Sequence, residues 1–386
     1  MGLLGYLIKH SNSQVQTAPP RGAVFLFSLP YFCGMVDYLI VGGGLTGIAL
    51  AHVLEEQGRS FRLIADRAQG ATGVAGGLYN PVILKRFTLA YRAEEQMDGV
   101  DSFYQGIEAK LQQRVDEKLE VLRIFHSVEE QNNWFAASDK PGLERFLSTT
   151  IQPNTNEQII APHGLGRVLE TGRVDTAKLQ SAYLDYLHQK GWLLEERLNH
   201  EELEHLSDGV HYKDLQAQRI VFAEGFGLKQ NPFFNYLPLT GTKGELLTIH
   251  CPGLQISKVI KAGVFIIPLG DDLYRIGATY KWKDKTNTPT SESREELLQK
   301  LAVFLEADFE VVDHHAGIRP TVTDRRPLVG QHPEYAHYWV LNGMGSRGVM
   351  TAPFAAKLLF DCIEEGQALP EEMDIARFSD KWGTTV

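Results

Sequence analysis

The sequence predicts an α/β fold, and three observations support this prediction. A β-rich run, a glycine turn, a helical pattern and a second strand follow one another over 36–64, which is the order of a βαβ unit in a parallel sheet. The same order of strand, glycine turn and helix returns over 338–365. Two strand-like runs at 264–278, joined by a Gly-Asp-Asp turn, predict an antiparallel hairpin in the middle of the chain.

Length and composition limit the functions open to the chain. Its 386 residues, 43% of them hydrophobic, can bury a large core and favour two lobes over one. The formal net charge of −10 disfavours general nucleic-acid binding, because phosphates would be repelled. The three cysteines, Cys33, Cys251 and Cys362, are scattered as is typical of reduced thiols, so we expect a cytoplasmic protein.

The first residues differ in character from the rest. An uncharged run at 22–36 is interrupted by Pro30 and is too short to cross a bilayer, so we expect no membrane span. The first predicted strand begins directly after Met35. We therefore treat residues 1–34 as an N-terminal extension and hypothesise that Met35 is the native start.

A nucleotide-binding fingerprint lies at the first glycine turn. In Gly42-x-Gly44-x-x-Gly47, the glycines permit a tight turn, a close approach of a pyrophosphate and close helix packing. Asp66 ends the second strand about 20 residues later, where an acid would bind the ribose, although the adjacent Arg67 would instead suit a 2′-phosphate. The alternative is a glycine turn without a ligand. The predicted turn residues are Gly42, Gly43, Gly44, Leu45, Thr46 and Gly47.

The second glycine turn, at 343–348, favours FAD over NAD. No acidic strand end follows it at the fingerprint distance, so it is not a second dinucleotide site. The start of its helix could face the flavin and stabilise negative charge there, or the turn could serve close packing alone. With one nucleotide site, the electrons would come from the organic substrate. The predicted cofactor contacts here are Gly345, Ser346, Arg347, Gly348 and Val349.

The order of several short motifs resembles the D-amino-acid oxidase family of flavoproteins. These motifs are the two glycine turns, 73–80, 219–225, 237–245, 277–279 and 317–330. The resemblance implies a discontinuous, Rossmann-like FAD-binding domain at 35–95, 160–235 and 310–386, and an antiparallel-sheet α+β substrate domain at 96–159 and 236–309. It further implies cofactor contacts at Gly76, Gly77, Glu224 and Gly225.

The family also implies a chemistry: hydride transfer from the carbon beside an amine to flavin N5. An arginine in a Gly-x-Arg-Pro motif binds the substrate carboxylate, and here that residue is Arg319; the alternative is a structural ion pair. Tyr280 and Asn80 are the other expected substrate contacts. FAD should be non-covalent, because histidines and an alanine at 314–316 replace the cysteine that attaches flavin in sarcosine oxidases. We assign no catalytic acid or base.

Other side chains have less specific interpretations. The adjacent histidines at 314 and 315 lack a third ligand, so no metal site is predicted. Lys243 follows a strand signal and would touch the flavin or lie in solvent. Ser293 with Glu296 forms an apparent capping box ahead of a helix.

Three functions remain open at this point. The first is oxidation of a small amine or amino acid, with oxygen or another electron acceptor. The second is oxidation of a carboxymethylaminomethyl-type uridine in tRNA, because the string at 343–348 resembles the FAD domain of a bifunctional wobble-uridine enzyme. The acidic net charge disfavours tRNA, and the methyltransferase half is missing. The third is a flavin-binding protein without catalysis.

Overall fold

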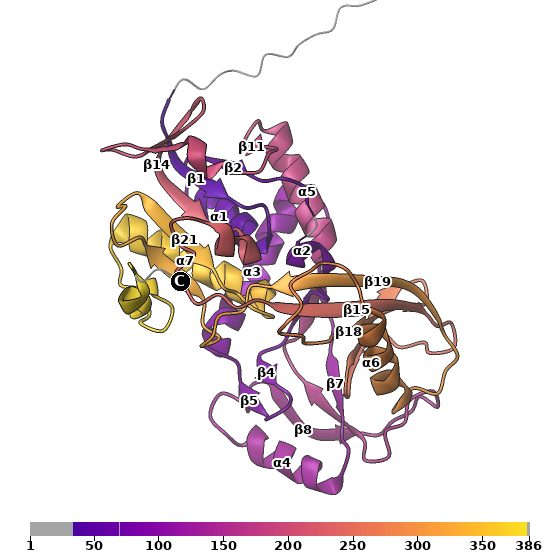
Figure 1. The fold of residues 1–386 in the computed structure, drawn as a ribbon. Helices are drawn as coiled ribbons and strands as arrows, with labels where there is room; N and C mark the ends of the chain where they lie inside the picture. Colours follow the sequence, from indigo (N-terminus) through magenta and orange to yellow (C-terminus); the bar gives the residue numbers. More distant parts are fainter. Residues whose placement is uncertain (1–33, 69, 384–386) are drawn as a thin grey trace, which may run out of the picture. The chain divides into compact units, whose positions relative to one another are not determined.

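The computed structural model describes residues 34–68 and 70–383, and it confirms the α/β class (Figure 1). The extension predicted at 1–34 therefore lies outside the described residues, except for Gly34. The helices are α1 (Leu45–Glu56), α2 (Ala71–Val74), α3 (Ala93–Leu111), α4 (Val128–Ser138), α5 (Thr176–Gln189), α6 (Ser291–Ala302) and α7 (Gly348–Glu365). Within these described ranges, no helix is both long and apolar enough to cross a bilayer.

The first large sheet has a parallel centre, in the order β11-β2-β1-β14-β21. Antiparallel strands β13 and β12 continue it beyond β14, and β20 pairs with β21. Its centre thus joins segments from both ends and the middle of the chain. The strands are β1 (Val36–Val41), β2 (Phe61–Ile64), β11 (Leu193–Leu194), β12 (Leu203–His205), β13 (Val210–Tyr212), β14 (Leu215–Phe222), β20 (Leu328–Gln331) and β21 (Tyr338–Asn342).

Both faces of this sheet are covered, which explains why β1 is an almost unbroken apolar run. On one face, Tyr38 and Ile40 join the core formed by α1, α3, α5 and α7. On the other face, Leu39 and Val41 pack with apolar side chains of 228–239 and with Ile375. Buried alanines allow α1 and α7 to approach each other closely.

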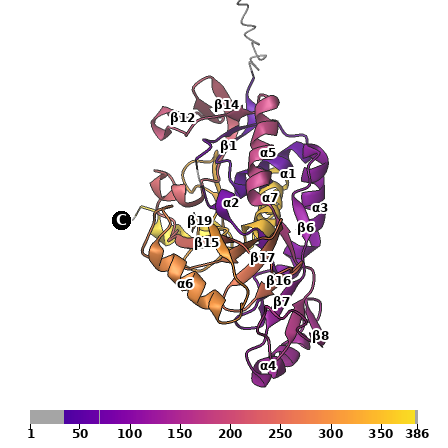
Figure 2. The ribbon, with the colours of Figure 1, turned by 90° about the vertical axis from the view of Figure 1, so that its right-hand side faces the viewer.

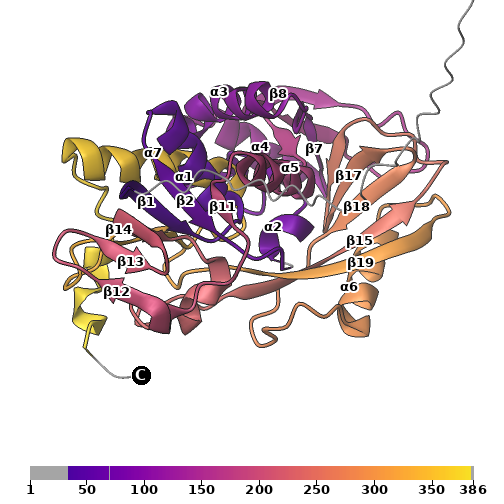
Figure 3. The ribbon, with the colours of Figure 1, turned by 90° about the horizontal axis from the view of Figure 1, so that it is seen from above.

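The second large sheet is antiparallel except where β16 lies parallel to β7, and its order is β19-β15-β18-β17-β16-β7-β9-β8. Figure 3 shows the long strands β15 and β19 side by side, and Figure 2 shows α6 next to them. The strands are β7 (Val121–Ile124), β8 (Leu147–Gln152), β9 (Leu165–Val168), β15 (Thr242–His250), β16 (Val259–Lys261), β17 (Phe265–Gly270), β18 (Leu273–Gly277) and β19 (Glu310–Arg319).

Two small sheets complete the strand inventory of the described residues. One has the order β3-β10-β6 and the other pairs β4 with β5. Their bounds are β3 (Leu78–Tyr79), β4 (Val82–Ile83), β5 (Thr88–Leu89), β6 (Asp116–Lys118) and β10 (Gly172–Val174).

The chain crosses between the two large sheets more often than the predicted boundaries imply. Strands β9 and β19 come from segments assigned to the FAD-binding domain, yet they pair in the second sheet. Helix α3 begins in the segment assigned to that domain, continues into the one assigned to the substrate domain, and packs against α7. The domain boundaries stay a prediction.

The start of α6 corrects one expectation. The N-cap is Thr290, whose hydroxyl oxygen accepts a hydrogen bond from the Ser293 backbone N–H at 3.3 Å. The predicted capping box at Ser293 and Glu296 is therefore wrong, since the helix starts three residues earlier than that pair requires.

Candidate active site

A cavity of about 800 Å³ is lined by residues from both large sheets. The carboxyl ends of β1, β2 and β14 border it, as do residues of β15 to β19. The end of parallel strands is where α/β sheets bind nucleotides. A cavity of this size can hold a cofactor together with a small ligand.

The first glycine turn borders this cavity, and glycine is needed at its positions for different reasons. A Cβ at Gly47 would lie 1.9 Å from the Gly42 carbonyl oxygen, and one at Gly42 would lie 2.5 Å from the Ala223 oxygen. Protein packing alone therefore requires glycine at both positions. At Gly44 a Cβ would meet only the Thr72 hydroxyl, at 3.2 Å. A ligand approaching the start of α1 explains glycine there, so this turn fits a bound pyrophosphate.

The two residues at the end of β2 lie on different sides. Asp66 lines the cavity, where its carboxylate accepts a hydrogen bond from the Ala68 N–H at 3.3 Å. Arg67 does not line the cavity; it forms ion pairs with Asp185 at 2.8 Å and Glu195 at 3.0 Å. The arrangement suits a ribose with free hydroxyls rather than a 2′-phosphate.

The segment around α2 brings the nucleotide end of the cavity to the second sheet. Gly77 has a left-handed backbone (φ +74°), and a Cβ there would lie 1.9 Å from the Val174 oxygen. Gly76 approaches Ile267 of β17. Asn80 lines the cavity, and its side-chain oxygen accepts a hydrogen bond from the Val82 N–H at 2.8 Å. Thr72, which accepts from the Leu45 N–H at 3.0 Å, was missed because no motif singles it out.

The second glycine turn also borders the cavity. The Gly345 N–H donates to the Pro320 oxygen at 3.1 Å, which joins the start of α7 to the end of β19. The Asn342 side chain donates to the Gly225 oxygen at 3.0 Å. Arg347 lines the cavity, its buried Nε has no hydrogen-bond partner among the described residues, and burial lowers the pKa of its guanidinium. Glu224, Gly225 and the predicted residues 345–349 all line the cavity.

Arg319 reaches the cavity from the last position of β19. Its guanidinium crosses Gly244, where a Cβ would lie 1.9 Å from Nη2. Nη1 donates to the Thr279 oxygen at 3.3 Å, and the guanidinium carbon lies 5.3 Å from the centre of the Tyr280 ring. Burial lowers the pKa of this group. Within the described part of the chain, no carboxylate lies at ion-pair distance from Arg319. The alternative role considered for this residue, a structural ion pair, is therefore not found there.

An aromatic pair lies beside Arg319. Tyr280 lines the cavity, and its ring contacts that of Trp282 edge to face at 5.2 Å. The two side chains are 43% and 46% exposed. They therefore offer an apolar surface next to the candidate site.

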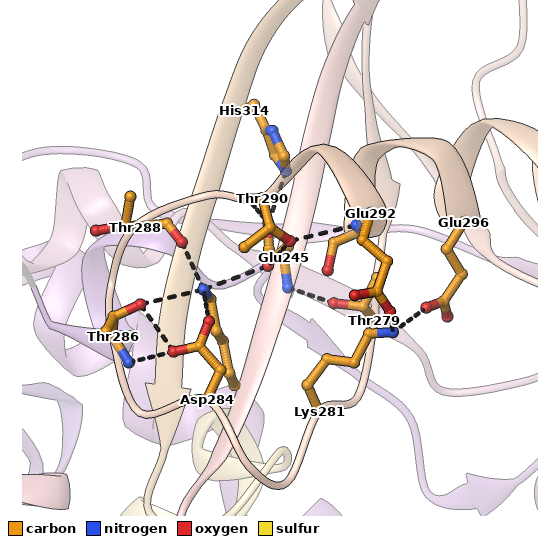
Figure 4. Close-up of polar contacts among 12 residues, drawn as sticks. Glu245, Thr279, Lys281, Asp284, Thr286, Thr288, Thr290, Glu292, Glu296 and His314 are labelled. Atoms are coloured by element: carbon orange, nitrogen blue, oxygen red, sulfur yellow. Dashed lines mark hydrogen bonds and ion pairs between the residues drawn. The ribbon is translucent and has the colours of Figure 1, made fainter.

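Residues 281–290, which we call the strap, are held against β15 by the side chains of Lys243 and Glu245 (Figure 4), and Asn287 of the strap also lines the cavity. Lys243 is fully buried there and pairs with Asp284 at 2.6 Å and with Glu245 at 3.4 Å. Its amine also donates to the Thr288 carbonyl oxygen at 2.5 Å. The expectation that Lys243 touches flavin or solvent is therefore wrong, because it alternates with Gly244 along the strand.

Glu245 holds the other end of the strap. Its carboxylate accepts hydrogen bonds from the Thr290 N–H at 2.7 Å and hydroxyl at 2.9 Å, and it lies 2.9 Å from His314 Nε2 (Figure 4). Burial acts to raise the pKa of Glu245, but hydrogen bonds from Thr290 and Ser293 and the nearby Lys243 hold it below its ordinary value. His314 thus has a structural partner, and no metal-binding cluster occurs within residues 34–68 and 70–383.

Lys261 is a cavity residue that sequence reasoning missed. It ends β16 and lines the cavity together with Phe265. A lysine at the end of a short strand is ordinary, and only strand pairing shows that it faces the site.

Comparison with known proteins identifies the family. The family model for DAO, "FAD dependent oxidoreductase", matches residues 37–362. Glycine oxidase of Pseudomonas aeruginosa is 23% identical over 356 residues, with 84% of this chain and 93% of that protein covered. The tRNA 5-methylaminomethyl-2-thiouridine biosynthesis bifunctional protein MnmC of Idiomarina loihiensis is 22% identical; 88% of this chain is covered, and only 57% of that protein.

Solved structures agree on the fold. Glycine oxidase from Geobacillus kaustophilus superposes with a TM-score of 0.71 at 19% identity, with 89% of this chain and 98% of that chain covered. L-proline dehydrogenase from P. horikoshii gives 0.73 at 16% identity, with 90% and 98% covered. The predicted family, the fold class and the dependence on FAD are thereby confirmed. The chain belongs to the DAO family and is an FAD-dependent oxidoreductase.

Proposed function

We propose that this enzyme oxidises the C–N bond of a small amine that carries a carboxylate, such as an amino acid or an N-alkyl amino acid. The observation that supports this most is Arg319, a half-buried guanidinium in the cavity without a carboxylate partner among the described residues. A guanidinium fork binds a carboxylate through two parallel hydrogen bonds. Relatives and structural neighbours bear the names glycine oxidase and L-proline dehydrogenase, and glycine and proline are both amines with a carboxylate.

The cavity residues fit FAD as the cofactor. The turn at 42–47 and the start of α1 would hold the pyrophosphate, and Asp66 the ribose. The start of α7 with Arg347 would face the flavin, where a positive group stabilises added negative charge. Bound FAD supplies a hydride acceptor. We propose non-covalent binding, because neither Cys251 nor Cys362 lines the cavity.

The chain's own residues then bind and orient the substrate. Arg319 would hold the carboxylate, and its bond to the Thr279 oxygen fixes the direction of the guanidinium. Tyr280 would cover one side of the bound molecule, while Leu246 and Ile267 keep water from the opposite wall. Holding the reacting carbon in one orientation is itself a large part of such catalysis.

No side-chain base is required in this proposal. The carboxylates among the described lining residues are Asp66, Glu196 and Glu224, which all belong to the nucleotide end of the cavity. No histidine of the described chain lines it. An amine that enters neutral can release hydride without proton abstraction from carbon, and the resulting imine is then hydrolysed.

Anaerobic bleaching of the flavin tests the proposal. Purified holoenzyme should be yellow and should bleach with at least one member of a panel of amino acids and N-alkyl glycines. The matching amines without a carboxylate should bleach it far more slowly, and Arg319→Met should remove this difference. Equal bleaching by acids and their decarboxylated analogues in the unmodified enzyme would refute the proposed role of the carboxylate.

A modified uridine in tRNA is the second candidate substrate. The exposed pair of Tyr280 and Trp282 beside the cavity supports it, because exposed aromatic rings stack on bases. The net charge of −10 opposes it. Incubating the enzyme with tRNA from cells that accumulate the carboxymethylaminomethyl uridine decides between the small amine and the tRNA as substrate. Flavin bleaching by this tRNA, but not by tRNA that lacks the modification, would support the tRNA substrate.

A further inference from the structure

We propose that Lys261 forms a second anion-binding position in the cavity, so that the preferred substrate is an amine with two acidic groups. One group would bind Arg319 and the other Lys261. This inference rests on the proposed function and makes it more specific, since it names the substrate class.

Strand pairing places the two cations on the same face of the second sheet. Lys261 of β16 pairs with Phe265 of β17, and Phe265 pairs with Gly277 of β18. Gly277 pairs in turn with Leu246 of β15. Directly paired residues share a face, and so do residues two apart on one strand. Leu246 pairs with residue 315 of β19, four positions before Arg319. All six positions therefore lie on one face of the sheet, which is the face toward the cavity.

The separation of the two cations excludes one shared carboxylate. Lys261 and Arg319 lie on strands four pairings apart and are offset by four residues, which places their Cα atoms on the order of 20 Å apart. The apolar side chains of Leu246, Phe265 and Ile267 line the cavity between them. A ligand that reaches both cations must therefore be a chain with an acidic group at each end and an apolar middle.

The Lys261 amine has no counter-ion in the part of the chain that the structure describes. Among the described residues it contacts the Gly263 oxygen at 3.4 Å and lies 4.5 Å from the centre of the Phe265 ring, and no carboxylate is within ion-pair distance. A lysine stem that packs on an aromatic ring while its charge stays in a cavity is ready to receive an anion.

The charges around Lys261 also favour an anion. Arg123 of β7 and Lys300 of α6 are the nearby cations, and each has its own carboxylate: Glu130 for Arg123 and Glu296 for Lys300. Burial, followed by these two cations, lowers the pKa of Lys261 to about 8. A bound anion would relieve this repulsion and keep the amine protonated.

Ligand titration of the holoenzyme tests the inference. Straight-chain dicarboxylates from glutarate to azelate, and monocarboxylates of the same lengths, are titrated while the flavin absorbance spectrum is followed. The unmodified enzyme should bind one dicarboxylate at least ~10-fold more tightly than its monocarboxylate, as a charge-assisted contact predicts. This preference should decrease as the pH rises through about 8, where free Lys261 loses its proton.

Variants assign the preference to Lys261. Lys261→Gln should abolish the preference for the dicarboxylate and leave the monocarboxylate affinity within about twofold, whereas Lys261→Arg should retain it. Lys258→Gln is the matched control, because Lys258 is 41% exposed, pairs with Glu120 and does not line the cavity. Flavin content and thermal midpoint show whether each variant is folded.

The outcomes separate this inference from the proposed function. Equal affinity for the two acids, or a preference that survives in Lys261→Gln, overturns the role of Lys261. If Arg319→Met still weakens monocarboxylate binding in that case, the proposed function stands. If no carboxylate perturbs the flavin and Arg319→Met changes nothing, both are overturned.

Discussion

Two lysines of the second sheet, Lys243 and Lys261, show how the same charge serves two purposes. Lys243 faces away from the cavity, is fully buried and has Asp284 and Glu245 as partners. Lys261 faces the cavity and has no carboxylate partner among the described residues. A buried charge that is paired with carboxylates of the same protein stabilises the structure around it, which for Lys243 is the strap. An uncompensated charge at a cavity is available for a ligand.

Removing the compensated charge should have the largest effect on stability. Lys243→Met leaves Glu245 and Asp284 without their cation, and breaking a buried ion pair typically costs about 3–5 kcal/mol. We expect the urea midpoint to fall accordingly. Lys261→Met is the matched comparison and should leave the free energy of unfolding unchanged or raised. An equal loss in both variants would contradict the distinction between the two lysines.

Removing an uncompensated charge should instead affect catalysis. Arg319→Met should lower kcat/KM for the best carboxylate substrate about 100-fold, since losing one partner of a desolvated charge pair costs ~2–5 kcal/mol. Its urea midpoint should not decrease. Arg319→Lys should recover only part of the activity, because an ammonium lacks the two-pronged geometry. Unchanged kcat/KM in Arg319→Met would show that the carboxylate binds elsewhere.

The same comparison applies to the glycines of the first turn. Gly47→Ala would place a Cβ 1.9 Å from the Gly42 oxygen and should destabilise the protein even without FAD, by ~1–3 kcal/mol. Gly44→Ala meets only the Thr72 hydroxyl, so it should weaken FAD binding about tenfold while leaving apoprotein stability nearly unchanged. Fluorescence titration with FAD and urea unfolding of the apoprotein separate the two effects. Equal apoprotein stability for the two variants would contradict the assignment.

The strap should give a small dependence of stability on pH. Hydrogen bonds from Lys243 and Thr286 lower the pKa of Asp284 to about 2. Because the folded-state pKa is lowered, this stabilisation is present above the unfolded-state pKa near 4 and is lost as the pH falls toward about 2. Asp284→Asn should reduce the slope of urea midpoint against pH in that window. The same slope in both proteins would contradict the pairing.

The sequence predicts the parts of this molecule that depend on local patterns. The first βαβ unit follows from one short window, and the Gly-x-Arg-Pro motif directs attention to Arg319. Lys261 and Lys243 could not be assigned in this way, because their environments depend on the pairing of β15 to β19. Arg67 shows a limit of motif reading. Its neighbour Asp66 lines the cavity, whereas Arg67 pairs with Asp185 and Glu195, which are remote in sequence.

The parallel centre of the first sheet has a consequence for the order of folding. Strand β14 pairs with β1 on one side and with β21 on the other, so the ladder joins residues near 40, 220 and 340. Contacts between such distant segments form slowly, and during synthesis residues 220–222 of β14 must wait for β21 with one edge unpaired, because β13 pairs only with residues 215–217. A chain released before residue 342 would therefore expose that edge and lack the start of α7. We expect tight retention of FAD to mark chains whose translation is complete.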